Sequence, residues 1–209
     1  MAEPLLGGGG SRSLAPWAFD SVPFSADTVG PRGTGGFPMV RTRIELNREL
    51  EPVPLPASLM SEICGHALDT APEECCGLVM GTLQHRFERP CRISNMMTKM
   101  HLSDPVSFPR DARQAYYMTE VEYLRALQEA EASGRFITAV YHSHVDVGAY
   151  LSEEDLAYAE HPLFPFPGAA QIVISVVGGR VKEAAIFEAD SSVGHFRGAT
   201  GRLLEVVDA

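Results

Sequence analysis

Two histidines and a downstream acidic residue form the pattern in this sequence that most directly indicates chemistry. His142 and His144 stand on either side of Ser143, and Asp155 follows at the end of the segment Ser152–Asp155. Histidines spaced by two residues next to a strand project from the same face, because side chains alternate along a strand. Two imidazole nitrogens and one carboxylate oxygen are a common ligand set for catalytic zinc, which keeps a fourth position for water. These three residues are therefore candidate zinc ligands.

Each part of this pattern also has an explanation that involves no metal. A His-x-His tripeptide occurs by chance in many sequences. Ser152-Glu153-Glu154-Asp155 has the form of a helix capping box, in which the serine caps the helix and the acidic residue reaches back. The two intervening glutamates favour a helix N-terminus through its dipole. Glu73 and Glu74 have the character of solvated turn residues before a strand. Taken one at a time, these residues leave the alternatives open.

The joint arrangement resembles the JAMM (MPN-type) metallopeptidase family. The signature of that family is a Glu far upstream, then His-[Ser/Thr]-His, seven residues, Ser, two residues and Asp, and His142–Asp155 matches it without a gap. The segment Pro72–Leu78 (PEECCGL) resembles the family's P-x-E-x-C-G-L segment and aligns the catalytic Glu with Glu74 rather than Glu73. The resemblance spans Val40 to Glu188 and indicates a compact, prokaryotic-like member of the family.

The resemblance implies a zinc hydrolase with a water in the fourth position of the metal. His142, His144 and Asp155 would be the ligands, and Glu74 the general base that takes a proton and later delivers it to the leaving amine. Ser152 would donate a hydrogen bond to the oxyanion of the tetrahedral intermediate, a role that competes with capping its helix. The cofactor implied is Zn²⁺.

The resemblance also implies a substrate class. The expected reaction is cleavage of a peptide or isopeptide bond at the C-terminal Gly-Gly of a ubiquitin-like or sulfur-carrier protein. Only 15 residues, 156–170, separate Asp155 from the next expected strand, which argues against the inserted segment of chain-specific deubiquitinases. Two alternatives are a non-catalytic MPN-type scaffold domain and a metallopeptidase for an unrelated peptide, from a phage tail or a cell wall. The oligomeric state is left open, a homodimer included.

Several other residues are weaker candidates for a role in the site. His66 is expected to be a structural histidine, His101 is a possible substrate contact, and His161 marks the end of a helix. Cys76 is expected to be a packing residue by the resemblance, although a thiol near zinc is conceivable for it and for Cys75. Three aromatic residues either line a substrate groove or belong to the core: Phe108, Tyr116 and Tyr117.

Apolar periodicity and turn residues predict the elements that position these side chains. Helices are expected from Leu55 to Asp69, after a capping box at Thr119–Glu122 with Val121, Leu124 and Leu127 as the apolar stripe, and from Ser152. Strands are expected at Val40–Leu46, Cys76–Gly81, Arg86–Ile93, Phe136–Tyr141, Gln171–Val177 and Arg180–Glu188, with Gly178-Gly179 as a hairpin turn. The segment Ser94–Arg113 is expected to be a long functional loop.

This order of elements predicts an α+β fold with a mixed or antiparallel sheet flanked by helices. The resemblance implies the same class, an MPN-like architecture related to that of cytidine deaminases. Residues 1–39 are rich in Gly and Pro and are expected to be a flexible tail, with residues 40–209 as the folded domain. Two interpretations of the tail stay open: an ordinary extension, or residues upstream of a true start at Met39.

Composition narrows the location and the partners. The chain has 209 residues and a formal net charge of -10, which argues against nucleic acid or an anionic membrane as the main partner. The sequence contains no run of about 18 apolar residues, so no transmembrane helix is expected. Met1–Gly10 lacks the features of a signal peptide. A cytoplasmic location is expected. The four cysteines include no C-x-x-C pair and are expected to be reduced thiols.

Overall fold

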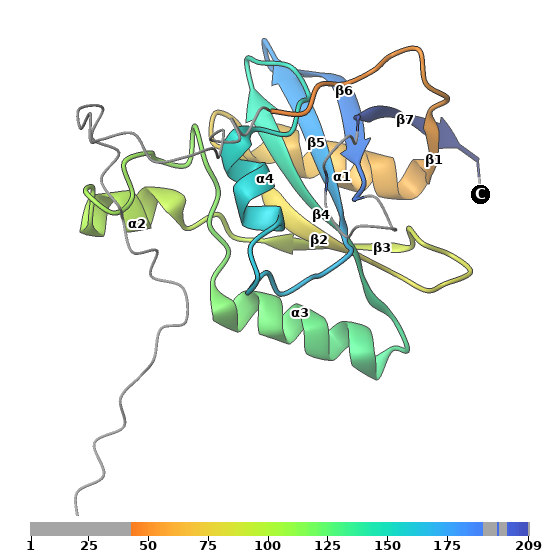
Figure 1. Cartoon of the computed structure of the whole chain (residues 1–209), viewed down its shortest axis with the longest axis horizontal. Coiled ribbons are helices and arrows are strands. Elements are labelled where there is room, and N and C mark those ends of the chain that lie inside the picture. The colour runs from red at the N-terminus through yellow and green to blue at the C-terminus, as the bar shows by residue number, and fades with distance from the viewer. Residues whose placement is uncertain (1–42, 190–195, 197–199, 209) are drawn as a thin grey trace, which may run out of the picture. The chain divides into compact units, whose positions relative to one another are not determined.

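The computed structural model describes residues 43–189, 196 and 200–208 (Figure 1). The prediction of a flexible tail at residues 1–39 lies outside these residues. None of the helices within the described ranges combines the length and the apolar composition that crossing a bilayer requires.

A seven-stranded mixed sheet forms the centre of the fold, in the order β1-β7-β6-β5-β4-β2-β3. Neighbouring strands are antiparallel except for the pairs β1–β7 and β4–β5, which are parallel. The predicted class, α+β with a mixed sheet, is therefore confirmed. The strands are β1 (Val53–Pro56), β2 (Cys76–Gly81), β3 (Arg89–Ile93), β4 (Phe136–Val145), β5 (Ala170–Val177), β6 (Arg180–Phe187) and β7 (Arg202–Val207).

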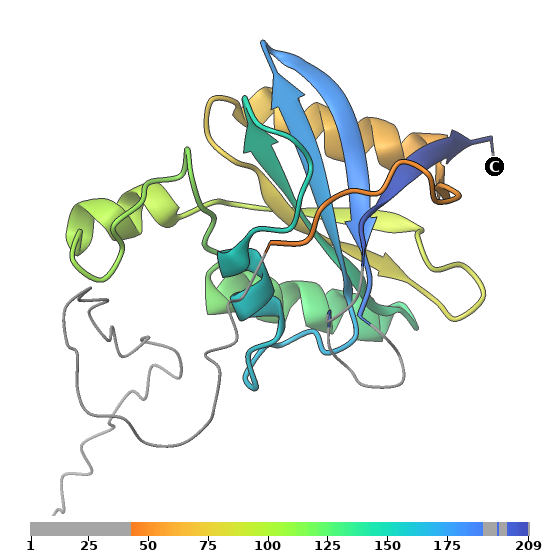
Figure 2. The ribbon, with the colours of Figure 1, turned by 45° about the horizontal axis from the view of Figure 1, so that its top comes forward.

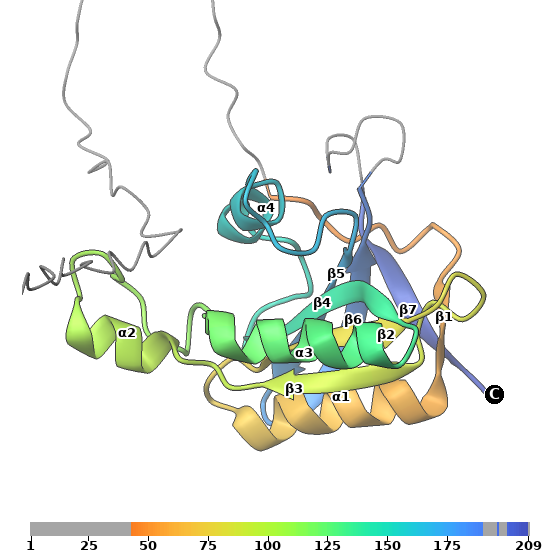
Figure 3. The same ribbon diagram turned by 90° about the horizontal axis from the view of Figure 1, so that it is seen from below.

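Helices cover both faces of this sheet (Figure 2 and Figure 3). On one face α1 (Ala57–Thr70) buries Leu59, Ile63 and Ala67 in a cluster that includes Tyr141 of β4. On the other face lie α3 (Glu120–Ala132) and α4 (Glu153–Ala159). The remaining helix, α2 (Met97–Ser103), has no buried residue.

The predicted helices and central strands are confirmed, with differences at their ends. The strand β2 and the hairpin between β5 and β6 lie where they were expected, and Gly178 and Gly179 adopt the positive φ values of that turn. Thr119 caps α3 by accepting a hydrogen bond from the backbone N–H of Glu122. The strand β4 continues four residues beyond Tyr141, so the two histidines lie within it. The strand β3 begins at Arg89, three residues later than predicted.

Other predictions about the elements were wrong. The described part of Val40–Leu46 forms only isolated bridges, not a strand. The strands β1 and β7 and the helix α2, inside the expected loop Ser94–Arg113, were not predicted.

The predicted apolar stripe of α3 was wrong at two of its three residues. Val121 is 78% exposed and Leu124 43% exposed, whereas Leu127 packs against the core as predicted. The fully buried residues of this helix are Ala126 and Ala130, so small side chains rather than Val121 and Leu124 mark its buried face.

A glycine in β2 makes room for the strand that carries the histidines. A Cβ atom added at Gly77 would overlap the ring of Tyr141, which is fully buried and whose hydroxyl is 2.9 Å from Nδ1 of His66. The ring cannot give way, because it is packed between β2 and α1.

We therefore expect Gly77→Ala to lower the free energy of unfolding by about 1–3 kcal/mol, the usual cost of overpacking a core. Gly65→Ala is the matched control, because a Cβ atom there would lie 3.7 Å from Arg92, an ordinary contact, in the middle of α1. That variant should gain about 0.5–1 kcal/mol from the better helix former. Urea unfolding of both variants measures the difference, and equal midpoints would contradict the close approach.

Candidate metal centre

The strand β4 holds the two histidines in the interior of the sheet. It lies between β2 and β5, so that His142 faces Cys76 on one side and Val173 on the other. His142 is fully buried and His144 is 5% exposed. Their spacing of two residues places both imidazoles on the same face of the sheet, as predicted.

The helix α4 brings the acidic residue to the same place through its capping box. The hydroxyl of Ser152 accepts a hydrogen bond from the backbone N–H of Asp155 at 3.1 Å. In return, Oδ2 of Asp155 accepts from the backbone N–H of Ser152 at 3.0 Å and from its hydroxyl at 2.5 Å. The two explanations of this segment, helix cap and metal ligand, are thus compatible, because the cap fixes the carboxylate that faces the histidines.

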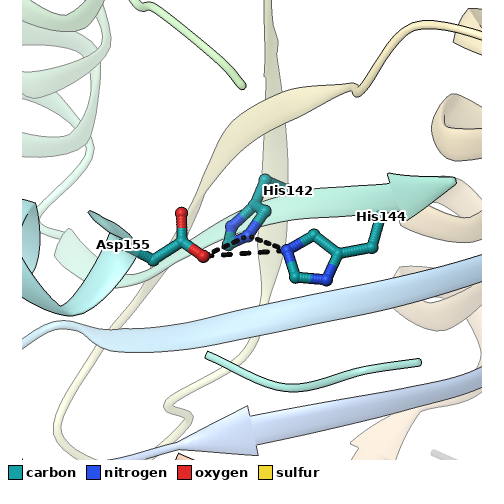
Figure 4. A group of neighbouring side chains, drawn as sticks. All are labelled: His142, His144 and Asp155. Atoms are coloured by element: carbon teal, nitrogen blue, oxygen red, sulfur yellow. Dashed lines mark hydrogen bonds and ion pairs between the residues drawn. The ribbon is translucent and has the colours of Figure 1, made fainter. Parts of the chain in front are cut away.

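Three ligand atoms converge at this point (Figure 4). Nε2 of His142 lies 3.2 Å from Nε2 of His144 and 3.4 Å from Oδ2 of Asp155, and the third separation is 3.7 Å. Ligands placed tetrahedrally at 2.0–2.1 Å from a zinc ion are about 3.3–3.4 Å apart. The three separations therefore fit one face of a zinc coordination tetrahedron, and the His-His-Asp group could hold a metal ion.

The proton positions favour the same conclusion. Nδ1 of His144 lies 3.1 Å from the carbonyl oxygen of Gly148, which only accepts, so this nitrogen carries the ring proton. In the neutral ring the lone pair of His144 is then on Nε2, directed toward His142 and the carboxylate of Asp155. Electron-pair donors that face one another in a buried place are what a cation requires. Nδ1 of His142 has no hydrogen-bond partner among the described residues.

His142 and Asp155 shift the pKa of one another. Burial alone would raise the pKa of Asp155, but the charge and hydrogen bond of His142 and the hydrogen bonds of His144 and Ser152 hold it well below its usual range. For His142, burial lowers the pKa, and the nearby carboxylates of Asp155 and Glu74 outweigh this effect and raise it. The carboxylate is therefore ionised and available as a ligand.

Glu74 lies beside this group, just before β2. The residue is 7% exposed, and burial raises its pKa to about 7, with a further increase from Asp155 and opposing effects from His142 and Arg110. Its backbone N–H donates to the carbonyl of Ala112 at 2.7 Å, and its own carbonyl accepts from the side chain of Asn95 at 2.8 Å. The environment of Glu74 thus differs from that of a solvated turn residue.

The neighbouring glutamate points elsewhere. Glu73 accepts a hydrogen bond from the hydroxyl of Thr98 at 2.8 Å and is half-buried. Between Glu74 and the histidines, the backbone N–H of Cys75 donates to Oγ of Ser143 at 2.8 Å, and Ser143 N–H donates back to Cys75 at 3.1 Å. These two bonds extend the pairing of β2 and β4 up to the position of Glu74.

Aromatic rings cover both imidazoles. The sequence analysis left open whether Tyr116 lines a substrate groove or belongs to the core. Its ring stacks on His142 with ring centroids 4.8 Å apart and an interplanar angle of 28°. Tyr150 lies 4.8 Å from the ring of His144, at 60°. Tyr150 was not predicted, because a single aromatic residue in the loop before α4 carries no periodic signal.

Asn95 and Arg110 were also missed by the sequence analysis. Besides Glu74, the side chain of Asn95 contacts the backbones of Ala115, Met97 and Tyr117 and so holds the long segment against the site. Arg110 pairs with Glu154 at 2.6 Å, next to Asp155 in the sequence.

The weaker candidates take structural positions. His66 bonds to Tyr141, and burial first and then Arg92 lower its pKa to about 4, outweighing Asp69. Cys76 is fully buried, as expected of a packing residue. Nδ1 of His101 lies 2.6 Å from the carbonyl of Phe108, within the long segment. A contact of His101 with substrate stays a prediction.

The fold and the ligand group together define an MPN-type domain with a candidate metal centre. The model of a family described as prokaryotic homologs of the JAB domain matches residues 56–189, and the chain belongs to this family. The residues that carry the resemblance to MPN-type metallopeptidases lie within the matched range.

Three solved structures are among those that match this chain. A protein of Desulfitobacterium hafniense shares 18% identity with a TM-score of 0.52, over 75% of this chain and 93% of that one. A protein of Salinibacter ruber shares 24% identity (TM-score 0.49, 75% and 92% covered), and a JAB1/MPN domain protein from Archaeoglobus fulgidus 15% (0.38, 75% and 99%). No curated protein matches the chain.

The ligand group predicts one zinc ion per chain, measurable by elemental analysis of the purified protein. Zinc at 100 times its Kd should stabilise the fold by about 2.7 kcal/mol, because the metal binds the folded state. We expect His144→Ala to lose both the metal and this stabilisation. His85→Ala, which removes an exposed histidine between β2 and β3, is the control and should keep both. Equal zinc contents in the two variants would contradict the assignment.

Proposed function

We propose that this protein is a zinc-dependent hydrolase that cleaves a peptide or isopeptide bond at the C-terminal Gly-Gly of a ubiquitin-like or sulfur-carrier protein. The observation that carries the proposal is the convergence of His142, His144 and Asp155 on one point with the buried carboxyl of Glu74 beside it. Membership of the family is compatible both with a metal-dependent hydrolase and with a scaffold. The complete ligand group with an adjacent buried acid favours the hydrolase.

The three ligands would hold the metal, and zinc in such a site supplies a Lewis acid that lowers the pKa of water and polarises the scissile carbonyl. Glu74 would act as the general base. Burial raises its pKa to about 7, close to the pH at which a carboxyl group both accepts and returns a proton efficiently. Its backbone is fixed on both sides, by Ala112 and Asn95, which limits the positions that its side chain can take.

Ser152 would donate a hydrogen bond to the oxyanion. A hydroxyl group has one donor and two acceptor positions. The oxygen of Ser152 accepts from the backbone of Asp155, which is the cap, while its proton is directed to Oδ2 of Asp155. Turning the proton toward a substrate oxygen leaves the cap in place, so the two roles need not compete.

The covering of the imidazoles favours small residues at the cleaved bond. Tyr116 and Tyr150 pack against the two histidine rings, and we infer that they narrow the approach to the ligand group. A chain that ends in two glycines needs less room beside these rings than any other sequence, and its backbone adopts the widest range of conformations. This supports a Gly-Gly terminus as the substrate over a peptide with bulky side chains.

The role of Glu74 as general base can be tested with a substrate made by extending a carrier protein a few residues beyond its Gly-Gly. We expect Glu74→Gln to cleave it about 10²–10⁴-fold more slowly than the wild type, the usual contribution of a general base. The zinc content should be unchanged, because Glu74 is not a ligand. Glu73→Gln is the matched control and should cleave at nearly the wild-type rate, because Glu73 faces Thr98.

Equal rates for the two glutamine variants would refute the role of Glu74. A zinc-loaded wild type that cleaves no extended carrier would instead favour the scaffold alternative or an unrelated peptide substrate.

Ser152→Ala separates the oxyanion role from the cap. Loss of the cap alone should cost about 1 kcal/mol of stability, whereas loss of the oxyanion donor should lower kcat about 10²–10³-fold. Thr119→Ala, which removes the equivalent cap of α3, is the control and should lose stability without the loss of rate. Steady-state kinetics with thermal unfolding of both variants measures the difference. A Ser152 variant that loses only stability would limit this residue to capping.

A further inference from the structure

The orientation of His144 depends on one backbone carbonyl. Its Nδ1 donates to the carbonyl oxygen of Gly148 at 3.1 Å, which directs Nε2 to the candidate metal position. Hydrogen bonds to the second nitrogen of a metal-binding histidine commonly fix its ring and its tautomer. The placement of the loop 146–151, between β4 and α4, therefore bears directly on metal binding.

The sheet holds one side of this loop. The backbone N–H of Asp146, a residue with a φ of 58°, donates to Val176 at 2.7 Å. The hydroxyl of Ser175 donates to the carbonyl of Val147 at 2.5 Å, and the backbone N–H of Ala149 donates to Oε1 of Glu183 at 3.3 Å. Gly148 thus lies between two residues whose backbones are bound to β5 and β6.

A segment that precedes β1 holds the other side. We call Arg43–Arg48 the strap. The backbones of Ile44 and Leu151 exchange two hydrogen bonds, of 2.9 and 3.0 Å. The guanidinium of Arg43 lies 4.7 Å from the centre of the Tyr150 ring, and this ring is in turn 4.8 Å from that of His144. The strap therefore reaches a candidate zinc ligand through a single intervening side chain.

The other end of the strap supplies the charge partner of Glu183. Arg48 pairs with Glu183, whose side chain is only 8% exposed. A nearby cation offsets the cost of burying a carboxylate to this extent. The end of the strap is fixed by the backbone N–H of Asn47, which donates to Gly201 at 2.8 Å, next to β7.

We propose that the strap is a part of the zinc site and that Arg43 and Arg48 are positioning residues for His144. Arg43 holds Tyr150 against the imidazole. Arg48 holds Glu183, which fixes the backbone next to Gly148. This inference rests on the proposed function for the identity of the metal alone, and it concerns the affinity for zinc rather than the cleavage reaction.

Arg43 and Arg48 are exposed, so a role in positioning His144 can be distinguished from a role in the stability of the fold. Their side chains are 58% and 57% exposed, so each contributes little to the stability of the fold. Metal ligands, in contrast, must be held within about 0.5 Å of their productive positions. Loss of the strap contacts should therefore weaken zinc binding more than folding.

The test measures the zinc Kd of Arg43→Ala/Arg48→Ala by competition with a chromophoric chelator, together with the thermal unfolding of the metal-free protein. We expect the Kd to rise about 10-fold or more, within the range known for partners of metal ligands. The unfolding temperature of the metal-free protein should move no more than that of the control. Arg89→Ala is the matched control: it removes an arginine that is also 57% exposed and pairs with Glu129 at 2.7 Å, on the edge strand β3.

An unchanged Kd in the double variant, or an equal rise in Arg89→Ala, would overturn the proposal. Glu183→Gln provides the measurement if the double variant does not fold, because it keeps the side chain and removes only its charge; its Kd should rise in the same direction. A wild type that binds no zinc overturns this inference together with the proposed function. A protein that cleaves its carrier but binds zinc independently of the strap refutes this inference alone.

Discussion

The convergence of three electron-pair donors in a place from which water is largely excluded is the interaction on which the rest of the site depends. The two Nε2 atoms and Oδ2 of Asp155 are separated by 3.2–3.7 Å. Such a group is unfavourable without a compensating positive charge, because burial removes the water that would solvate the carboxylate. A bound metal ion would supply that charge, and a proton on His142, whose pKa Asp155 raises, supplies it otherwise. The sheet and the helix α4 hold the three ligands together.

Ordinary elements of secondary structure do most of this work. The strand β4 is paired on both sides, so His142 and His144 cannot move apart without breaking ladders to β2 and β5. The capping box of α4 contributes about 1 kcal/mol to the helix, and its second hydrogen bond orients the carboxylate of Asp155. The backbone of the loop between β4 and α4 adds a further contact, the hydrogen bond from Nδ1 of His144 to the carbonyl of Gly148.

The sequence predicts those parts of the fold whose signal is local. Turn glycines, the caps at Thr119 and Ser152, and the apolar run of β2 place the corresponding elements correctly. The strand β1 was missed because its two prolines resemble a linker, yet an edge strand tolerates proline. The buried face of α3 was misassigned in part, because its fully buried residues are alanines while Val121 extends into solvent. The aromatic cover of the site and the strap depend on contacts between distant segments, which no local pattern encodes.

The alternation of side chains along a strand explains why Glu74, and not the adjacent Glu73, faces the histidines. Glu74 is two residues from Cys76, and Cys76 pairs with His142 across β2 and β4. Because side chains alternate, Glu74 belongs to the face of the sheet that carries the histidines, whereas Glu73 lies in the bend before the strand and bonds to Thr98. A slip of one residue between β2 and β4 would move Glu74 to the opposite face. The two hydrogen bonds between Cys75 and Ser143 oppose that slip, so the middle residue of the His-Ser-His tripeptide, which binds no metal, selects the carboxyl group that faces the site.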